Sequence, residues 1–467
     1  MGTNLLGEHA VVLGAGMSGL LAARVLADRF RAVTIVERDE LPDGPDSRRG
    51  VPQGRHPHAL LGRGALILDE LYPGILGELV ADGAPVWNDG DLSKVHTSFR
   101  GHLTVRSGKA LDGLNAIAMY QPSRPLLEHH VRRRTSACEN VTILDRHDVA
   151  ELTPSPGHTR ITGVRVINRD KDTVHELSAD LVVDAMGRGA HTPALLERLG
   201  YGRPIEEHIP MRTTYVSQKV RIRPGTLHEV LVNISPAPGR PAGMFLVRYE
   251  DDTWIFTVFG MAGTEPPHEL DDMLAFAGAY APSHLLDAVR GGEPLAPVVQ
   301  HRMPSSQRRR YDTMRRFPEG LIVTGDAMCS FNPIYGQGMS VAALDALSLR
   351  DALRGGMTDL PRRYFRAAAK AIDIAWDLSA GSDLAFPEVD GYRPLKVRLN
   401  NRLADWVLSA CETDPAAAAQ FFLTASLIDP PERLLRPSFL YRVARVNRRR
   451  RQRDSQPDLI ETASVPL

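Results

Sequence analysis

Two glycine-rich turns near opposite ends of the 467-residue chain contain the residue types that bind phosphates and ribose hydroxyls. The first, at residues 14–19, satisfies G-x-G-x-x-G and follows a short apolar run. The second, at residues 325–339, begins with Gly-Asp after an apolar run and contains a Gly-Gln-Gly that opens a predicted helix. Because each turn lies between a predicted strand and a predicted helix, together they predict one extended dinucleotide, such as FAD, held by both.

The first turn has the features of a pyrophosphate site. Gly14 permits a tight turn, Gly16 lets the backbone approach a pyrophosphate, and Gly19 allows close packing of helix on strand. A helix opening at Ser18 would offer free N–H groups to phosphate. The next predicted strand ends at Glu37, 23 residues after Gly14, near the ~20 expected for an acid that binds an adenosine ribose. The turn alone fits NAD as well as FAD.

Three arginines are candidates for contact with such a ligand. Arg38 could lie over an adenine or take a 2′-phosphate. Arg49 belongs to a Pro-, Gly- and Arg-rich loop at residues 41–58, which is longer than ordinary connections and whose arginines could meet a pyrophosphate. Arg124 starts a predicted helix capped by Ser123, where a positive side chain opposes the helix dipole. That local mismatch indicates a ligand contact.

Bulk composition limits the class of protein. The 56 basic and 56 acidic residues balance, so net charge indicates neither nucleic acid nor membrane as a partner. Three cysteines without a CxxC pair fit a reducing cytoplasm and indicate neither disulfides nor a metal site. No apolar run reaches the ~18 residues of a transmembrane helix. We therefore expect a cytoplasmic protein of two or more structural units.

Periodic patterns predict the elements between and beyond the two turns. Residues 59–82 predict one amphipathic helix, whereas residues 211–260 predict strands with Trp254, Phe256 and Val258 on one face. This block predicts an antiparallel sheet that could cover a flat ligand.

The end of the chain predicts helices over residues 361–450, closing with a basic cluster at residues 448–453. Two interpretations of the cluster remain open: a solvated helix end, or weak binding to acidic surfaces.

In this order, the pieces resemble the group A flavoprotein monooxygenases of the p-hydroxybenzoate hydroxylase type. The resemblance extends from residue 9 to about residue 360. It rests on GAGMSG at 14–19, Glu37-Arg38, Arg124, the Asp184 corner and GDAMCSFNPIYGQGM at 325–339. A narrower resemblance, in residues 48–64 and 182–189, is to bacterial epoxidases and hydroxylases that act on polyketide or terpenoid intermediates.

The resemblance implies FAD as cofactor, NAD(P)H as electron donor, and O₂ and a small molecule as substrates. It implies that Asp326 binds the ribityl hydroxyls and that Pro333 and residues 336–339 lie along the isoalloxazine ring, where a helix start would stabilise the negative charge of reduced flavin. The expected cofactor-binding residues are Gly14, Gly16, Ser18, Gly19, Glu37, Arg38, Arg49, Arg124, Asp326, Pro333, Gly336, Gln337, Gly338 and Met339.

The resemblance implies an α/β (α+β) fold in which a Rossmann-like FAD-binding domain is interleaved with an antiparallel-sheet substrate domain and followed by a C-terminal helical region. The expected boundaries are 1–83, 118–200 and 300–360 for the FAD-binding domain, 84–117 and 201–299 for the substrate-binding domain, 361–450 for the helical region and 451–467 for a flexible tail.

The implied activity is insertion of one oxygen atom from O₂, through a flavin C4a-hydroperoxide, into an electron-rich apolar natural-product intermediate, by epoxidation or hydroxylation. No side chain is expected to be an obligate nucleophile. Candidates for lining the cavity are His58, Phe331, Tyr335 and the sheet face around Trp254.

One departure leaves the electron donor open. Asp184 is followed by Ala-Met-Gly-Arg, whereas the aromatic hydroxylases have Asp-Gly followed by Ser and Arg at a corner linked to both FAD and NAD(P)H. Hydride could come directly from NAD(P)H or through a separate reductase. Two alternative functions also remain: a reductase or dehydrogenase of the geranylgeranyl-reductase type, which would turn over without O₂, and a non-catalytic flavin-binding protein.

Overall fold

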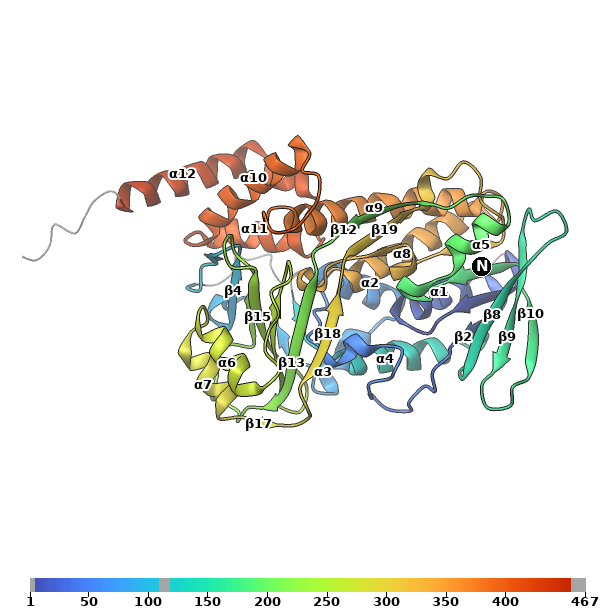
Figure 1. Ribbon diagram of the computed structural model, residues 1–467, viewed down its shortest axis with the longest axis horizontal. Coiled ribbons are helices and arrows are strands. Elements are labelled where there is room, and N and C mark those ends of the chain that lie inside the picture. Colours follow the sequence, from blue (N-terminus) through green and yellow to red (C-terminus); the bar gives the residue numbers. More distant parts are fainter. Residues whose placement is uncertain (1–4, 109–117, 455–467) are drawn as a thin grey trace, which may run out of the picture.

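The computed structural model describes residues 5–108 and 118–454 (Figure 1). Part of the expected substrate domain, residues 109–117, and most of the expected tail, residues 455–467, lie outside the described residues.

A five-stranded parallel sheet forms the base of the half of the molecule that contains both glycine-rich turns. Its order is β20-β11-β1-β2-β7, with β1 (Gly7–Leu13) at the centre. The other strands are β2 (Phe30–Val36), β7 (Val141–Leu144), β11 (Leu181–Asp184) and β20 (Leu321–Val323). They are mostly apolar runs because a parallel sheet is covered on both faces.

Helices cover one face of this sheet and a three-stranded antiparallel meander covers the other. The helices are α1 (Met17–Ala27), α2 (Gly62–Leu71), α3 (Ile75–Ala81), α4 (Arg124–Ser136), α8 (Gly338–Leu353) and α9 (Leu360–Asp383). The meander is β8 (His147–Pro154), β9 (Ile161–Asn168) and β10 (Val174–Ser178). This packing fixes both glycine-rich turns at one edge of the sheet, because β1 and β20 run in the same direction.

The single helix predicted for residues 59–82 is wrong. The segment forms two helices, α2 (Gly62–Leu71) and α3 (Ile75–Ala81). Pro73 between them lacks an N–H group, and Gly74 adopts a φ of +87°, which side-chain-bearing residues rarely adopt. The apolar periodicity continues across the break, which is why the pattern alone reads as one helix.

A large, mainly antiparallel sheet forms the second half of the molecule. Its strands are β13 (Thr213–Arg221), β14 (Leu231–Ile234), β15 (Ala242–Arg248), β16 (Thr253–Gly260), β4 (Val95–Phe99), β5 (His102–Leu103), β17 (Glu293–Pro294) and β18 (Val299–Met303). β4 pairs in parallel with β14. This pairing supports our proposal that residues 84–117 and 201–299 make one substrate domain.

Shorter elements join the two halves. They are α5 (Thr192–Arg198), β3 (Val86–Trp87), β6 (Met119–Tyr120), β12 (Ile205–Ile209), β19 (Ser306–Arg310) and β21 (Cys329–Ser330). On the outer face of the large sheet lie α6 (Leu270–Gly278) and α7 (Ser283–Arg290).

Three helices follow α9 and gather at the end of the molecule opposite the β8–β10 meander (Figure 1). They are α10 (Leu395–Cys411), α11 (Pro415–Ala425) and α12 (Pro437–Asp454). Among the described helices, none is both long and apolar enough to cross a bilayer. The parallel sheet, the antiparallel sheet and this helical region together confirm the fold class predicted from the sequence.

Candidate functional site

A cavity of about 1280 Å³ begins at the first glycine-rich turn, passes the second turn, continues along the inner face of the large sheet and ends among the C-terminal helices. Its volume exceeds the ~300–1,000 Å³ of a usual small-molecule site. It therefore has room for an extended cofactor and a second molecule.

Each glycine of the first turn is favoured at its position for a different structural reason. Gly14 has a φ of +99°. A Cβ on Gly16 would meet nothing within 4 Å, whereas a Cβ on Gly19 would lie 1.9 Å from the carbonyl oxygen of Gly14. α1 begins at Met17 without a side-chain cap among the described residues, so its first N–H groups are free for a ligand.

The acid at the end of β2 is part of a buried ionic network. The Glu37 carboxylate accepts hydrogen bonds from the backbone N–H of Ala15 at 2.8 Å and of Asp39 at 3.0 Å. Arg48 lies 3.2 Å from Glu37, donates to Asp39 at 3.0 Å and donates to Glu128 at 2.6 Å. This network holds the first turn, β2 and α4 in register at the edge of the cavity.

Arg124 presents an unsatisfied hydrogen-bond donor at the cavity. It is buried and pairs with Glu128 at 2.8 Å through Nη2, while Nη1 has no hydrogen-bond partner among the described residues. Ser123 caps its helix by accepting from the N–H of Leu126. Because a buried donor without a partner is costly, Nη1 fits an oxygen-rich ligand such as a ribose or phosphate.

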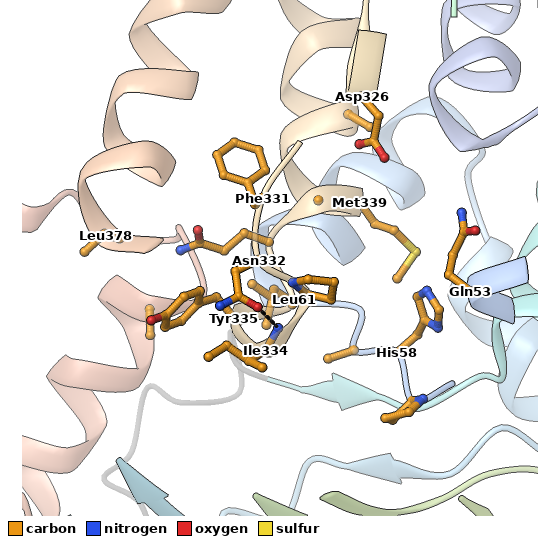
Figure 2. Close-up of a pocket in the computed structure, with 18 of the residues that line it drawn as sticks. Gln53, His58, Leu61, Asp326, Phe331, Asn332, Ile334, Tyr335, Met339 and Leu378 are labelled. Carbon is orange, nitrogen blue, oxygen red and sulfur yellow. Dashed lines mark hydrogen bonds between the residues drawn. The ribbon is translucent and has the colours of Figure 1, made fainter. Parts of the chain in front are cut away.

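The second turn places a carboxylate and a helix start on the opposite wall. Asp326 follows β20 and is open to the cavity. Enclosure raises its pKa, and Arg188 and Arg124 oppose that rise. α8 begins at Gly338, where an added Cβ would meet nothing within 4 Å. Figure 2 shows Asp326 above the space toward which Met339, Gln53 and His58 point.

Twelve of the fourteen predicted cofactor-binding residues line this one cavity, and the two that do not are Gly19 and Arg49. Gly19 acts instead by close packing of α1 on the turn. The loop arginine on the cavity wall is Arg48 rather than its neighbour Arg49. Arg38 lines the cavity but is largely exposed, with Asp148 at 3.9 Å.

At the corner after β11, the acid Asp184 forms hydrogen bonds with neighbouring residues of the corner. The Asp184 carboxylate accepts from the backbone N–H of Met186 at 3.0 Å and from the Thr192 hydroxyl at 2.5 Å. The following residues, 185–189, line the cavity, and Arg188 donates to the Ser330 hydroxyl at 2.8 Å. Asp184 thus shapes the corner rather than facing a ligand.

The far part of the cavity is mostly apolar. Phe331, Tyr335 and His58 line it as expected, but the hypothesis that the Trp254 face lines it is wrong. Trp254, with Phe256 and Val258, packs under α6 and α7. The inner face of the same sheet contributes other side chains, namely Tyr215, Leu231, Phe245 and Val247.

An aromatic cluster that the sequence did not reveal closes the far end. Phe99 of β4 contacts Phe421 and Phe422 of α11, with ring centroids 5.2 and 6.2 Å apart. All three line the cavity. No pattern could join them, because more than 300 residues separate β4 from α11.

Two histidines on the wall between these regions are neutral at pH 7. Burial, with the positive charge of Arg124, lowers the pKa of His58 to about 3, and burial with His301 lowers the pKa of His56 to about 4. The His56 Nδ1 lies 2.7 Å from the Ser217 hydroxyl. They can therefore exchange hydrogen bonds with a substrate without adding charge to an apolar space.

A buried carboxyl group ties the second turn to the C-terminal helices. Asp383, at the end of α9, accepts from the Asn332 amide at 2.9 Å and from the Tyr335 hydroxyl at 2.9 Å. Asn332 in turn accepts from Tyr215 of β13 at 2.9 Å. Burial raises the pKa of Asp383 to about 7. The network holds the loop before α8 between the sheet and α9.

This pKa predicts a pH-dependent stability. Between pH 3.8 and about pH 7 the Asp383 carboxyl keeps its proton in the folded state but loses it in the unfolded chain. The free energy of unfolding therefore falls as the pH rises through this range. We expect Asp383→Asn, which keeps the accepting oxygen, to reduce the stability lost between about pH 5 and pH 8 by ~2–3 kcal/mol. Urea unfolding of the apoprotein across this pH range measures the change in the free energy of unfolding. The control is Asp377→Asn, which replaces an exposed acid on the same helix. An unchanged pH slope in Asp383→Asn would contradict the assignment.

Comparison with known proteins identifies relatives in sequence and in fold. Protein Rv3254 of Mycobacterium tuberculosis is 38% identical over 431 residues, covering 90% of this chain and 90% of that protein. A kynurenine 3-monooxygenase of Salinispora tropica is 25% identical over 403 residues, covering 80% of this chain and 79% of that protein. The crystal structure of PqsL, a probable FAD-dependent monooxygenase from Pseudomonas aeruginosa, superposes with a TM-score of 0.59 at 15% identity, covering 89% of this chain and 100% of that chain. No family model matches the chain.

The identity to Rv3254 extends over nearly the full length of both chains, and the kynurenine 3-monooxygenase aligns over four fifths of the chain at lower identity. The likeness to PqsL shows the same fold. These findings confirm the resemblance stated from the motifs. The chain belongs to the family of Rv3254, and its fold is that of the FAD-dependent monooxygenases whose motifs it resembles.

Proposed function

We propose that the cavity holds FAD between the two glycine-rich turns and oxygenates an apolar, electron-rich small molecule bound beyond the flavin ring. The observation that carries the proposal is the continuity of one cavity from the first turn, past Asp326 and the start of α8, to the Phe99 cluster. Cofactor and substrate regions thus meet in one continuous space, as oxygen transfer from a flavin requires.

The residues present fit FAD. The open space at Gly16 and the free start of α1 suit a pyrophosphate. The unpartnered Nη1 of Arg124 and the carboxylate of Asp326 suit hydroxyl and phosphate oxygens along the molecule. The start of α8 would face the pyrimidine edge of the flavin, where its N–H groups stabilise negative charge. We therefore retain Gly14, Gly16, Ser18, Glu37, Arg38, Arg124, Asp326, Pro333 and residues 336–339 as proposed contacts and add Arg48 in place of Arg49.

Bound FAD, reduced with electrons from NAD(P)H, supplies the activation of O₂. The chain positions the substrate and keeps water out of the site. The inner sheet face and the Phe99 cluster hold an apolar substrate and exclude water, and neutral His56 and His58 add hydrogen bonds without charge. An acyclic or polycyclic polyketide or terpenoid intermediate with an alkene or activated ring fits this lining, and the product is its epoxide or hydroxylated form.

Oxygen labelling tests this function. The FAD-loaded protein is incubated with NADPH, or with a flavin reductase and NADH, and a panel of terpenoid alkenes and polycyclic phenols under ¹⁸O₂. We expect one labelled oxygen atom in a product and no product without O₂. Reduced product formed anaerobically, with two added hydrogens and no label, would replace the proposal with a flavin-dependent reductase of the geranylgeranyl-reductase type.

A further inference from the structure

The cavity reaches the surface among the C-terminal helices. Ile374 of α9 and Leu435 of the short helix η8 (Pro431–Leu435) line the cavity and are also exposed. Lys396 and Asn400 of α10 share both properties. An opening therefore lies between α9, α10 and η8, at the apolar end of the cavity.

Exposed large apolar side chains are concentrated in the part of the chain that forms this opening. Twelve large hydrophobic side chains are exposed in the described residues, and six of them fall between residues 374 and 441, about one seventh of the chain. These six, the apolar rim, are between 37% and 86% exposed: Ile374, Tyr392, Leu395, Leu399, Leu435 and Tyr441. Single exposed hydrophobic residues are normal, but half of them in one seventh of the chain, two of which line the opening, mark an interaction surface.

The rim extends across two helices that run side by side in the same direction. The Asn447 amide donates to the Trp406 carbonyl at 2.9 Å, and Arg450 donates to the Ser409 hydroxyl at 3.2 Å, each spanning 41 residues of sequence. The first turns of α10 and α12, with Leu395, Leu399 and Tyr441, therefore lie at the same end of the pair. Figure 1 shows both helices on the outside of the molecule.

Positive charge accompanies the rim, although the chain as a whole is neutral. Residues 393–452 carry twelve basic and five acidic side chains. Arg442 pairs with Asp414. Arg445, Arg448 and Arg449 are exposed on α12 and form no ion pair within the described residues. The balanced charge of the whole chain thus conceals a local excess beside the opening.

We propose that the apolar rim and the α12 arginines dock the protein peripherally on an anionic lipid bilayer. Exposed apolar side chains beside a run of arginines are the composition of interfacial surfaces, because the former enter the headgroup boundary and the latter meet anionic headgroups. A bilayer also accumulates apolar molecules, so docking there would put the opening against the source of substrate. That last step rests on the proposed function, whereas the docking does not.

Vesicle co-sedimentation of the full chain loaded with FAD tests the docking. We expect sedimentation with phosphatidylcholine vesicles that contain about one quarter phosphatidylserine, and release as salt shortens the reach of the charges. Vesicles of phosphatidylcholine alone should retain little protein. Absence of sedimentation with the anionic vesicles at low salt would overturn the proposal and would leave the oxygenation assay untouched, since the two readouts are separate.

Charge reversal on α12 locates the surface. The variant R445E/R448E/R449E should lower the vesicle partition coefficient at least tenfold. The matched control R198E/R223E/R315E reverses three arginines that are also exposed but lie outside α12 and its neighbouring helices, and it should bind as the parent does. Equal losses in both variants would mean that net charge alone drives binding, which contradicts a docking surface.

The apolar rim separates a bilayer from other polyanions. The variant L395S/L399S/Y441S should bind anionic vesicles several-fold more weakly while eluting from immobilised heparin at the parent's salt concentration, since it keeps every arginine. If this variant bound vesicles as the parent does, the surface would be a general site for acidic polymers or an acidic protein, and the lipid proposal would be wrong. Circular dichroism confirms that each variant is folded.

Discussion

Replacing Asp326 with alanine should abolish stoichiometric FAD binding while the fold survives. The carboxylate stands in the cavity next to Arg124 and Arg188, and no hydrogen bond to another described residue occupies it. Two charge-assisted hydrogen bonds to hydroxyls would each contribute ~1.5–3 kcal/mol, so we expect the Kd for FAD to rise at least ~100-fold. Titration of apoprotein with FAD, followed by flavin fluorescence, measures the change.

The apoprotein provides the control for this variant. Because enclosure raises the pKa of Asp326, its charge does not stabilise the empty protein, and Asp326→Ala apoprotein should melt no lower than the parent. Asp377→Ala removes an exposed acid from the other end of the same cavity and should bind FAD normally. A purified Asp326→Ala protein that kept yellow, stoichiometric FAD would refute the ribityl assignment.

Two alanine substitutions three residues apart in the first turn, at Gly16 and Gly19, should impair the protein for different reasons. Gly16→Ala places its Cβ in open space, whereas Gly19→Ala places its Cβ 1.9 Å from the Gly14 carbonyl oxygen. We expect Gly16→Ala apoprotein to keep nearly the parent stability but to lose the rise in Tm that FAD gives the parent. Gly19→Ala apoprotein should lose ~1–3 kcal/mol or more before any ligand is added, because the backbone must move.

Thermal melts of both variants with and without FAD separate these expectations. The parent should gain stability in proportion to the logarithm of FAD concentration. If Gly16→Ala gained as much as the parent, a pyrophosphate would not lie against Gly16. If Gly19→Ala apoprotein melted like the parent, close packing of α1 on the turn would not be the role of the third glycine.

Local signals were sufficient for the dinucleotide-binding half. The strand–glycine–helix order around residues 14–19 depends on neighbours in sequence, so the turn, the free helix start and the position of Glu37 could all be predicted. The same holds for Asp326 after β20. The choice between Arg48 and Arg49 could not be predicted, because an irregular loop has no periodicity that fixes which of two adjacent side chains faces inward.

Long-range packing explains what the sequence did not reveal. Every residue of β16 is buried, so its pattern cannot indicate which face meets α6 and α7 and which meets the cavity. The sequence therefore offers the Trp254 face as a cavity wall, although that face packs against α6 and α7. Likewise, the pairing of Phe99 with α11 and the Asp383 network depend on where the C-terminal helices dock, which is a tertiary property.

The visible spectrum of the purified protein, before and after addition of FAD, tests the central claim most directly. The account predicts flavin bands that co-elute with the chain at one FAD per molecule, bleach when NADPH or a supplied reductase delivers electrons anaerobically, and return on admission of air. A chain that binds no FAD after reconstitution, although circular dichroism shows it folded, would contradict the account.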